Sequence, residues 1–386
     1  MDIKIIPGKK LEGSISVPPS KSVTHRAFIM AALASGITTI INPLVSEDTD
    51  TTLNCLSQLG VGIKKEKDRV IILGTNGNIN PDKKQITLNV KESGTSYRFL
   101  KAVSFLSSVS IHFTGSNRLL ERPIKPLEEA LLQIPKGEVR LDSSLSSQFL
   151  SALLIISPVL KKGLIIHLIS RLPSHPYVDI TVDLMKKFGV NVNVKDNKTY
   201  DVPPQKYQGV TYRIEGDYSS ASYFILANEL GAKIKFKNLT ENSVQGDKKI
   251  LEIIKDKKEN IDMSFFPDLV PTVSVLASFN NYKTVITGIK NLRHKESDRI
   301  EALQTELTKT GIKINSSENT LEIMGGNPKG DIFNTWKDHR IAMSLSILAC
   351  FARGESVIKN AEVVNKSYPN FWKDLKNLGA NIIVIH

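Results

Sequence analysis

The chain has few cysteines, few aromatic residues and no long apolar run. Only Cys55 and Cys350 occur in 386 residues, which argues against a disulfide framework and against a zinc site. No stretch is long and apolar enough to span a bilayer. The N-terminal sequence MDIKIIPGKK has no signal-peptide core and is typical of an edge strand. These absences predict a reduced, cytoplasmic protein.

The charge balance points to an acidic partner. The formal net charge is +12, which is compatible with a nucleic acid, a membrane surface or an anionic metabolite. Only 6% of residues are aromatic, which disfavours an RNA-binding module, since such modules stack bases on aromatic rings. A length of 386 residues is more than one ordinary hydrophobic core accommodates, so two domains are expected.

Six short polar segments each precede a long, mostly apolar stretch. An apolar stretch of this kind predicts a buried helix, and a helix N-terminus offers free N–H groups and a positive dipole end to an anion. The repetition therefore predicts a binding site for an acidic ligand. The six openings are KSVTHR (21–26), GTSYR (94–98), SSQ (146–148), SSA (219–221), PD (267–268) and DHR (338–340).

An amphipathic helix is expected after each buried one, which gives a repeating unit of strand, buried helix, strand, outer helix and strand pair. Four outer helices end in a glycine followed by alternating apolar residues, as in LGVGIKK and TGIKINS. The second and fourth units lack this phrase and are expected to be shortened by a hairpin. The outer helices are predicted at 48–59, 124–133, 176–188, 246–256, 297–310 and 368–378.

The six units divide into two groups of three, with a boundary near 212–216. The sequence thus predicts an α/β (α+β) fold with two similar domains. One domain comprises residues 20–214, and the other comprises 1–19 together with 215–386. The N-terminal strand at 3–6 would pair with the C-terminal group.

Each polar opening also has a purely structural interpretation. Lys21 and Arg26 fit a solvated basic helix end as well as an anion site. Ser146 is a natural N-cap, and Asp268 likewise fits simple N-capping. Residues 295–299 form a charge run that is typical of a solvated face, with Ser297 as the helix cap. Arg122 precedes a helix-initiating proline and has an equally simple structural role.

Nine motifs, in order along essentially the whole chain, resemble those of the 5-enolpyruvylshikimate-3-phosphate synthases. They are PSKSVTHRA, SGTSYR, ERPI, SSQF, PSHPYVDIT, GDYSSASY, KESDRI, DHRIAMS and KSYPNF. The resemblance implies two domains, each of three βαβαββ units of the inside-out α/β barrel type. It also implies transfer of the enolpyruvyl group of phosphoenolpyruvate to the 5-hydroxyl of shikimate-3-phosphate, in chorismate and aromatic amino-acid biosynthesis. No metal or other cofactor is implied.

The same resemblance implies roles for particular residues. Lys21, Asp268 and Glu296 would be catalytic, and Lys21 would contact both substrates. The domain 20–214 would hold shikimate-3-phosphate and the other domain phosphoenolpyruvate. The implied shikimate-3-phosphate contacts are Lys21, Ser22, Arg26, Ser146, Ser147, Gln148, Ser174, Tyr177, Asp268, Asn291 and Lys295. The implied phosphoenolpyruvate contacts are Lys21, Gly94, Arg122, Gln148, Arg299, Arg340 and Lys366.

One residue departs from the family pattern, since Glu92 stands where the family usually has Asn, beside Gly94. We expect its side chain to point away from the ligand or to pair with Lys91 or Lys101. The related enolpyruvyl transferases that act on UDP-N-acetylglucosamine are the nearest alternative. They typically carry a Cys or Asp on a mobile loop, and neither cysteine here is expected in such a loop. A monomer that binds small molecules, with no nucleic-acid or membrane partner, is expected.

Overall fold

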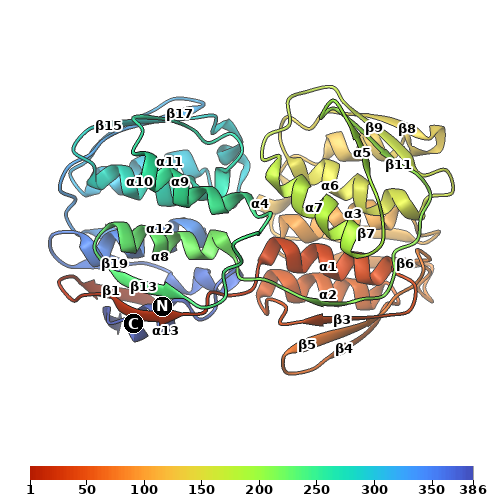
Figure 1. Cartoon of the computed structure of the whole chain (residues 1–386), viewed down its shortest axis with the longest axis horizontal. Helices are drawn as coiled ribbons and strands as arrows, with labels where there is room; N and C mark the ends of the chain where they lie inside the picture. Colours follow the sequence, from red (N-terminus) through yellow and green to blue (C-terminus); the bar gives the residue numbers. More distant parts are fainter. Residues whose placement is uncertain (386) are drawn as a thin grey trace. The chain divides into compact units, whose positions relative to one another are not determined.

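The computed structural model describes residues 1–385, which form two compact units (Figure 1). The central unit is Pro19–Glu215. The terminal unit combines Met1–Pro18 with the chain from Gly216 onward. Each unit has its own hydrophobic core of buried side chains. Among residues 1–385, no helix has both the length and the apolar character needed to cross a bilayer.

The central unit has three sheets, ordered β12-β3-β5-β4, β10-β11-β9-β8 and β6-β7. Its helices are α1 (Lys21–Leu33), α2 (Glu47–Gln58), α3 (Gly94–Ser104), α4 (Asn117–Leu120), α5 (Lys125–Leu131), α6 (Ser147–Ile156) and α7 (Pro176–Lys187), with short 3-10 turns η1 (Ile134–Lys136) and η2 (Ser157–Val159). Its strands are β3 (Ile37–Ile41), β4 (Gly62–Lys65), β5 (Arg69–Leu73), β6 (Gln85–Asn89), β7 (Ser110–Thr114), β8 (Glu138–Leu141), β9 (Leu164–Leu168), β10 (Asn193–Lys195), β11 (Thr199–Val202) and β12 (Thr211–Arg213).

The terminal unit has the corresponding sheets β18-β19-β1-β20, β14-β15-β17-β16 and β13-β2. Its helices are α8 (Tyr218–Glu229), α9 (Ile250–Asp256), α10 (Val270–Phe279), α11 (Arg299–Lys309), α12 (His339–Phe351) and α13 (Phe371–Asn377), with 3-10 turns η3 (Gly246–Lys249), η4 (Pro267–Leu269), η5 (Lys290–His294) and η6 (Ala361–Lys366). Its strands are β1 (Asp2–Ile6), β2 (Glu12–Ile15), β13 (Lys233–Phe236), β14 (Asn260–Asp262), β15 (Lys283–Thr287), β16 (Lys313–Ser316), β17 (Thr320–Met324), β18 (Ile332–Phe333), β19 (Ser356–Ile358) and β20 (Asn381–Ile385).

The predicted repeat is clearest where the chain is continuous. The segments β8-α6-β9-α7-β10-β11 and β14-α10-β15-α11-β16-β17 each have a parallel strand pair joined by a buried helix, followed by an antiparallel hairpin. Glycine ends the outer helices α7 and α11, because the turns into the hairpins need the left-handed φ values of Gly189 (81°) and Gly311 (86°). The βαβαββ pattern expected from the sequence is confirmed.

Two of the sheets have only two strands, β6 with β7 and β2 with β13. The chain passes from α5 through η1 to β8, and from α9 directly to β14, so neither the second nor the fourth repeat forms a hairpin of its own. These two repeats are therefore shortened, as predicted.

The N-terminal strand β1 completes the last sheet of the terminal unit. It lies antiparallel between β19 and β20, with Ile3 opposite both Ile358 and Val384. Residues 3–6 thus pair with the C-terminal strands, as expected. In the same way β12, late in the central unit, pairs in parallel with the early strand β3.

The helices of each unit lie between its sheets (Figure 1). In the terminal unit α8, α10 and α12 contact one another, and in the central unit α3 contacts both α1 and α6. Nearly every residue of α1 and α12 is buried, in agreement with their apolar sequences. Among the described residues the strands of each sheet form a row with two free ends, so no sheet closes into a barrel.

Candidate active site

The predicted polar openings do lie at the first turns of buried helices. In the central unit Lys21 is the first residue of α1, Gly94 the first of α3, and Ser146 the N-cap of α6. These first turns expose N–H groups that have no partner within the helix, which is the arrangement that favours an anion.

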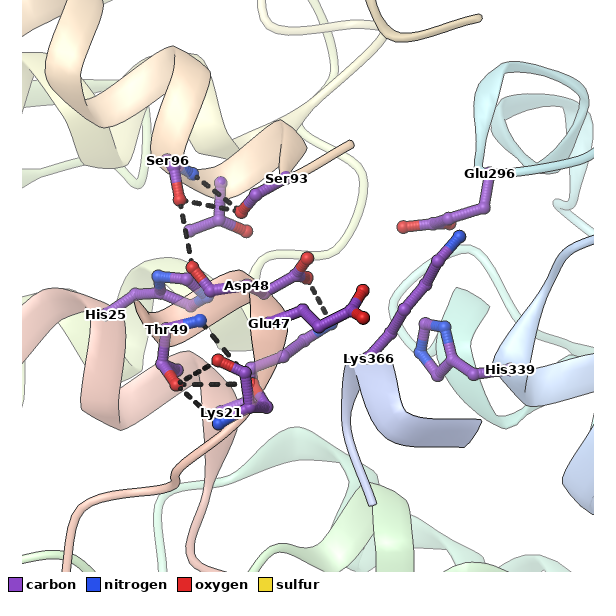
Figure 2. Close-up of polar contacts among 12 residues, drawn as sticks. Lys21, His25, Glu47, Asp48, Thr49, Ser93, Ser96, Glu296, His339 and Lys366 are labelled. Carbon is purple, nitrogen blue, oxygen red and sulfur yellow. Dashed lines mark hydrogen bonds and ion pairs between the residues drawn. The ribbon is translucent and has the colours of Figure 1, made fainter. Parts of the chain in front are cut away.

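Lys21 is held by a carboxylate that the sequence analysis did not select. Its Nζ donates to Asp48 Oδ2 at 3.1 Å, and the two side chains are only 15% and 14% exposed. Figure 2 shows the two side chains meeting. A cation at a helix N-terminus faces the unfavourable end of the dipole, so the Asp48 carboxylate compensates it. The acidic first turn of the helix predicted at 48–59 was the available sequence signal.

Hydrogen bonds through His25 and neighbouring hydroxyl groups link α1, α2 and α3 beside Asp48, and Figure 2 labels His25, Ser93 and Ser96. Ser96 Oγ donates to Ser93 Oγ at 2.7 Å and lies 3.3 Å from the Asp48 carbonyl oxygen. Thr52 Oγ1 is 2.7 Å from Ser96 Oγ and 2.8 Å from His25 Nδ1. Each hydroxyl has one proton to donate, so the network requires His25 to carry its proton on Nδ1.

His25 is neutral in this environment. It is buried, and desolvation, followed by the nearby charges of Lys21 and Arg26, lowers its pKa well below the ordinary value of 6.5. Its Nε2 is buried and has no hydrogen-bond partner among the described residues. His25 therefore orients the hydroxyl chain and adds no charge to the first turn of α1.

The Arg26 guanidinium is enclosed by α1, α6 and α7. Nε donates to Thr181 Oγ1 at 2.6 Å, NH1 to the Ser22 carbonyl at 3.0 Å, and NH2 to Ser151 Oγ at 3.3 Å and the Tyr177 carbonyl at 3.0 Å. Desolvation lowers the pKa of Arg26 to about 10, so it remains charged near neutral pH. The solvated helix end considered from the sequence is wrong for Arg26, which is a buried cation.

Gln148 is fixed by two neighbours at the start of α6. Ser146 caps the helix by accepting from the Gln148 N–H at 3.3 Å. Gln148 Oε1 accepts from Arg98 NH1 at 2.5 Å, and its Nε2 donates to Thr95 Oγ1 at 2.9 Å. Arg98 belongs to the quoted SGTSYR motif but was not predicted as a site residue. It lies in the same cluster as Gln148.

Gly94 and Arg122 are brought together in the central unit. A Cβ atom at position 94 would lie 2.8 Å from Arg122 NH1 and 3.0 Å from its Cζ. Only glycine therefore allows the guanidinium to lie against the first turn of α3. Arg122 is buried, and the phosphoenolpyruvate contact expected of both residues remains a prediction.

Glu92 is exposed in the turn that precedes α3. Of the two cations considered as partners, Lys101 forms an ion pair with Glu128 at 2.8 Å. Glu128 lies on α5. The outward orientation expected for Glu92 remains a prediction.

Ser174 and Tyr177 mark the start of α7. Ser174 is buried and adopts a left-handed backbone conformation with φ of 56°. The next residue, His175, lies 3.1 Å from Asp179 Oδ2 through Nδ1, and this hydrogen bond raises the pKa of His175. Ser147, also buried, begins α6.

In the terminal unit, Asp268 gathers three cationic side chains. Its Oδ1 accepts from Arg299 NH1 at 2.9 Å and lies 4.0 Å from Lys295 Nζ, while Oδ2 accepts from Arg340 NH2 at 2.8 Å. Asp268 does not cap a helix, because the N-cap of α10 is Leu269 and no side chain bonds there. The capping interpretation is wrong, since the carboxylate turns to the arginines.

Arg299 is the centre of this cluster and is only 1% exposed. Besides Asp268, its Nε donates to Asp338 Oδ2 at 2.7 Å and its NH2 to Glu296 Oε2 at 2.8 Å. Desolvation by burial would lower the pKa of Arg299, but the charges of Asp338, Glu296 and Asp268 outweigh it and raise the pKa. The charge run at 295–299 is thus a partly buried network around the buried Arg299 and not a solvated face.

The caps of α11 and α12 differ from one expectation. Asp298, not Ser297, caps α11, accepting from the N–H groups of Ile300 and Glu301 at 3.1 Å each. Ser297 Oγ instead donates to Asp338 Oδ2 at 3.2 Å. Adjacent Ser and Asp residues compete for one cap, and the serine hydroxyl is taken by a tertiary contact. The predicted Ser297 cap is wrong.

Lys366 and Asn291 occupy two further positions in the terminal unit. Lys366 Nζ donates to the Lys337 carbonyl at 3.0 Å. Asn291 lies in η5 and is buried, and its Oδ1 has no hydrogen-bond partner among the described residues. A buried acceptor without a partner is costly unless a ligand donates to it, which fits the predicted contact.

Asp247 is a buried carboxylate that sequence reasoning did not select. It accepts a short hydrogen bond from Ser219, in the first turn of α8. Desolvation, then the charge of Asp268, raises its pKa to about 7. Asp247 thus adds a group that titrates near neutral pH beside the arginine cluster.

Each unit therefore collects cations and carboxylates at helix starts. The central unit brings together Lys21, Arg26, Arg98 and Arg122, and the terminal unit Arg299 and Arg340 with Asp268, Glu296 and Asp338. Such groups bind anions and transfer protons. Among residues 1–385, no cluster of His, Cys, Asp or Glu is arranged to hold a metal ion.

Comparison with known proteins gives a consistent result. The family model described as EPSP synthase (3-phosphoshikimate 1-carboxyvinyltransferase) matches residues 5–135 and 133–375. The chain is 37% identical to a 3-phosphoshikimate 1-carboxyvinyltransferase of Pyrococcus abyssi, over 96% of this chain and 95% of that protein. It is 36% identical to the protein of that name from Clostridium perfringens, over 97% and 98%. A solved EPSP synthase structure from Acinetobacter baumannii superposes with a TM-score of 0.83, at 25% identity and covering 100% of both chains.

Proposed function

Because this chain belongs to the EPSP synthase family, we propose that it transfers the enolpyruvyl group of phosphoenolpyruvate to the 5-hydroxyl of shikimate-3-phosphate. Phosphate is released, and the product feeds chorismate and aromatic amino-acid biosynthesis. The observation that supports the proposal most is the Asp268–Arg299–Arg340 cluster, in which one carboxylate accepts from two guanidinium groups.

The reaction is an addition followed by an elimination. A proton adds to C3 of phosphoenolpyruvate while the 5-hydroxyl oxygen attacks C2 and loses its own proton, which gives a tetrahedral intermediate. C3 then loses a proton as the C2–O bond to phosphate breaks. The mechanism requires an acid, a base and several cations, because two multiply charged anions must be brought together. It requires neither a metal ion nor a redox cofactor.

For shikimate-3-phosphate we propose contacts mainly from the central unit. Two hydroxyl groups at the start of α6, together with the positive end of the helix dipole, suit a phosphate. The buried Asn291 Oδ1 would accept from a hydroxyl of the acceptor ring. The full proposed set is Lys21, Ser22, Arg26, Ser146, Ser147, Gln148, Ser174, Tyr177, Asp268, Asn291 and Lys295.

For phosphoenolpyruvate we propose the arginines of both units. Arg299 and Arg340 are already held in place by Asp268, and Arg122 is held against Gly94. These side chains therefore lose little conformational entropy when the ligand binds. The full proposed set is Lys21, Gly94, Arg122, Gln148, Arg299, Arg340 and Lys366.

Three groups are proposed for proton transfer. Asp268 is oriented by two guanidinium groups and would accept the proton of the 5-hydroxyl. Glu296 accepts from Arg299 NH2 through Oε2, and its carboxyl group would exchange the proton at C3. The Lys21 ammonium group can donate a proton from Nζ. It would assist proton transfer at C3 of phosphoenolpyruvate and neutralise negative charge of the substrates.

The structure does not favour the alternative acceptor UDP-N-acetylglucosamine. Cys55 lies in α2 and Cys350 in α12, both buried. Burial raises the pKa of the Cys55 thiol to about 11 and that of Cys350 to about 12, so neither forms a thiolate near neutral pH. We further propose a cytoplasmic monomer that acts on small molecules only.

The test compares the two acceptors. The protein is incubated with phosphoenolpyruvate and either shikimate-3-phosphate or UDP-N-acetylglucosamine, and the products are identified by mass spectrometry and NMR. We expect an enol ether at the 5-oxygen of shikimate-3-phosphate and no product from the sugar nucleotide. An enol ether formed only on the sugar nucleotide would assign the other acceptor.

A further inference from the structure

A fully buried carboxylate lies on α11 two turns beyond Arg299. Glu306 is 0% exposed and uses both oxygens. Oε1 accepts from the indole Nε1 of Trp336 at 2.8 Å. Oε2 accepts from the backbone N–H of Asn334 at 3.0 Å and from Lys309 Nζ at 2.5 Å. A buried charge is costly unless it is paired and bonded in this way.

Two of these donors belong to one short segment, residues 334–337, between β18 and α12. The backbone of this segment is unusual, because Trp336 and Lys337 both have left-handed φ values, of 53° and 55°. Such values are unfavourable for residues with a Cβ atom and persist only where the surroundings impose them. The Glu306 carboxylate, bonded to the main chain at 334 and to the side chain at 336, supplies that constraint.

The segment 334–337 leads directly to groups of the proposed active site. The Lys337 carbonyl accepts from Lys366 Nζ at 3.0 Å. The next residue, Asp338, caps α12 and accepts from Arg299 Nε at 2.7 Å. The direction of the Lys337 carbonyl follows from the left-handed turn, so a change in the turn moves the acceptor that holds Lys366.

We propose that Glu306 is a positioning residue for phosphoenolpyruvate binding, acting through the segment 334–337 on Lys366 and Asp338. The proposal rests on the proposed function for the role of Lys366 and Arg299, but the contacts of Glu306 do not. Glu306 touches no substrate. It fixes the turn at 334–337, whose Lys337 carbonyl binds Lys366. The same turn leads to Asp338, which binds Arg299.

The first test is Glu306→Gln, with Glu301→Gln as the matched control. Glu301 lies on the same helix, carries the same charge and is exposed. An amide at 306 directs its NH₂ group at one of two donors, Trp336 Nε1 or the Asn334 N–H, which leaves a buried donor unbonded. We expect the KM for phosphoenolpyruvate to rise five- to tenfold in Glu306→Gln, while the KM for shikimate-3-phosphate stays within twofold. The control Glu301→Gln should change neither KM value.

The second test uses Trp336→Phe, which removes the indole donor and keeps one aromatic ring. In the double variant Glu306→Gln/Trp336→Phe the amide oxygen accepts from Asn334 and its NH₂ group meets the aromatic ring. We expect the double variant to recover at least half of the loss seen in Glu306→Gln alone. A merely destabilised protein would instead become worse with each change.

Hydrogen exchange separates this proposal from the proposed function. The Asn334 amide should exchange at least tenfold faster in Glu306→Gln than in the wild type, whether or not the enzyme assay shows activity. Unchanged hydrogen exchange at 334–337 would show that Glu306 does not hold this segment in place and would overturn the proposal. Equal changes in the two KM values, or none, would overturn the link to phosphoenolpyruvate. A wild-type protein without activity would refute the proposed function alone.

Discussion

Carboxylates hold Lys21 in the central unit, and Arg299 and Arg340 in the terminal unit, in defined positions. Lys21 is bonded to Asp48, and Arg299 and Arg340 share Asp268. A buried guanidinium without such partners would cost several kcal/mol, about 3–5 when one partner is removed. The carboxylates therefore keep the cations fixed and charged before a substrate arrives.

Gly94 provides a direct test of one such position. In Gly94→Ala the new Cβ would lie 2.8 Å from Arg122 NH1, so the guanidinium must move. We expect the KM for phosphoenolpyruvate to rise about tenfold, which corresponds to about 1.4 kcal/mol, with the KM for shikimate-3-phosphate nearly unchanged. Steady-state kinetics with each substrate varied in turn measures both values.

Gly326→Ala is the matched control, because its Cβ would meet only Ile312 Cδ1 at an ordinary 3.5 Å. It should behave as the wild type. If Gly94→Ala did so too, the close packing of Arg122 on α3 would have no role in binding.

His25 predicts a pH dependence of stability. Its pKa is lowered in the folded state, so the unfolded chain binds more protons at acid pH. Its contribution is complete above about pH 6.5, the unfolded value, and stability is lost as the pH falls below it, by up to about 1.4 kcal/mol per pH unit. His25→Asn keeps a polar group near Thr52 and should make the difference in unfolding free energy between pH 7.5 and 5.0 smaller by about 2 kcal/mol.

Urea unfolding at the two pH values checks this. His112→Asn, at an exposed position, serves as the control and should leave the difference unchanged. A His25 variant with the same acid sensitivity as the wild type would mean that His25 is already protonated in the folded protein.

At the level of elements, the sequence was sufficient to locate the helix starts. A polar segment followed by an apolar run predicts a buried helix, and α1, α3, α6, α8 and α12 begin within about two residues of the predicted openings. The partners of the polar residues were not predictable. Asp48 is 27 positions from Lys21 and Asp268 is 72 from Arg340, so their pairing depends on tertiary packing.

The same limit explains the two wrong capping predictions. Ser297 and Asp268 are both good N-cap residues by local preference. Their side chains turn instead to Asp338 and to the arginines, which no local pattern reveals. Asp338, in contrast, does cap its helix α12, and it also pairs with Arg299.

Asp338 therefore combines two functions that two substitutions separate. Asp338→Asn keeps an N-cap for α12 but removes the charge opposite the buried Arg299, and we expect it to cost about 3 kcal/mol of unfolding free energy. Asp338→Ala also removes the cap and should cost about 1 kcal/mol more. Urea denaturation followed by circular dichroism compares the three proteins. An Asn variant as stable as the wild type would show that the pair contributes no net stability.

At the scale of the whole molecule, three strands are contributed from outside their own repeat. β1 completes the sheet of β19 and β20, β2 pairs with β13, and β12 pairs with β3. The strand expected at 3–6 precedes a complete set of three repeats, and its expected pairing with the C-terminal group is confirmed. The partners of β2 and β12 do not follow from spacing, because strand pairing between distant segments is a property of the folded unit.

We propose above all that the polar helix starts of both units serve a single enolpyruvyl transfer. The most direct test is a phosphate-release assay with phosphoenolpyruvate and shikimate-3-phosphate, with each substrate omitted in turn. We predict phosphate release only when both are present, in a one-to-one ratio with the enol ether product. Release from phosphoenolpyruvate alone, or no release with both substrates at saturating concentration, would contradict the claim.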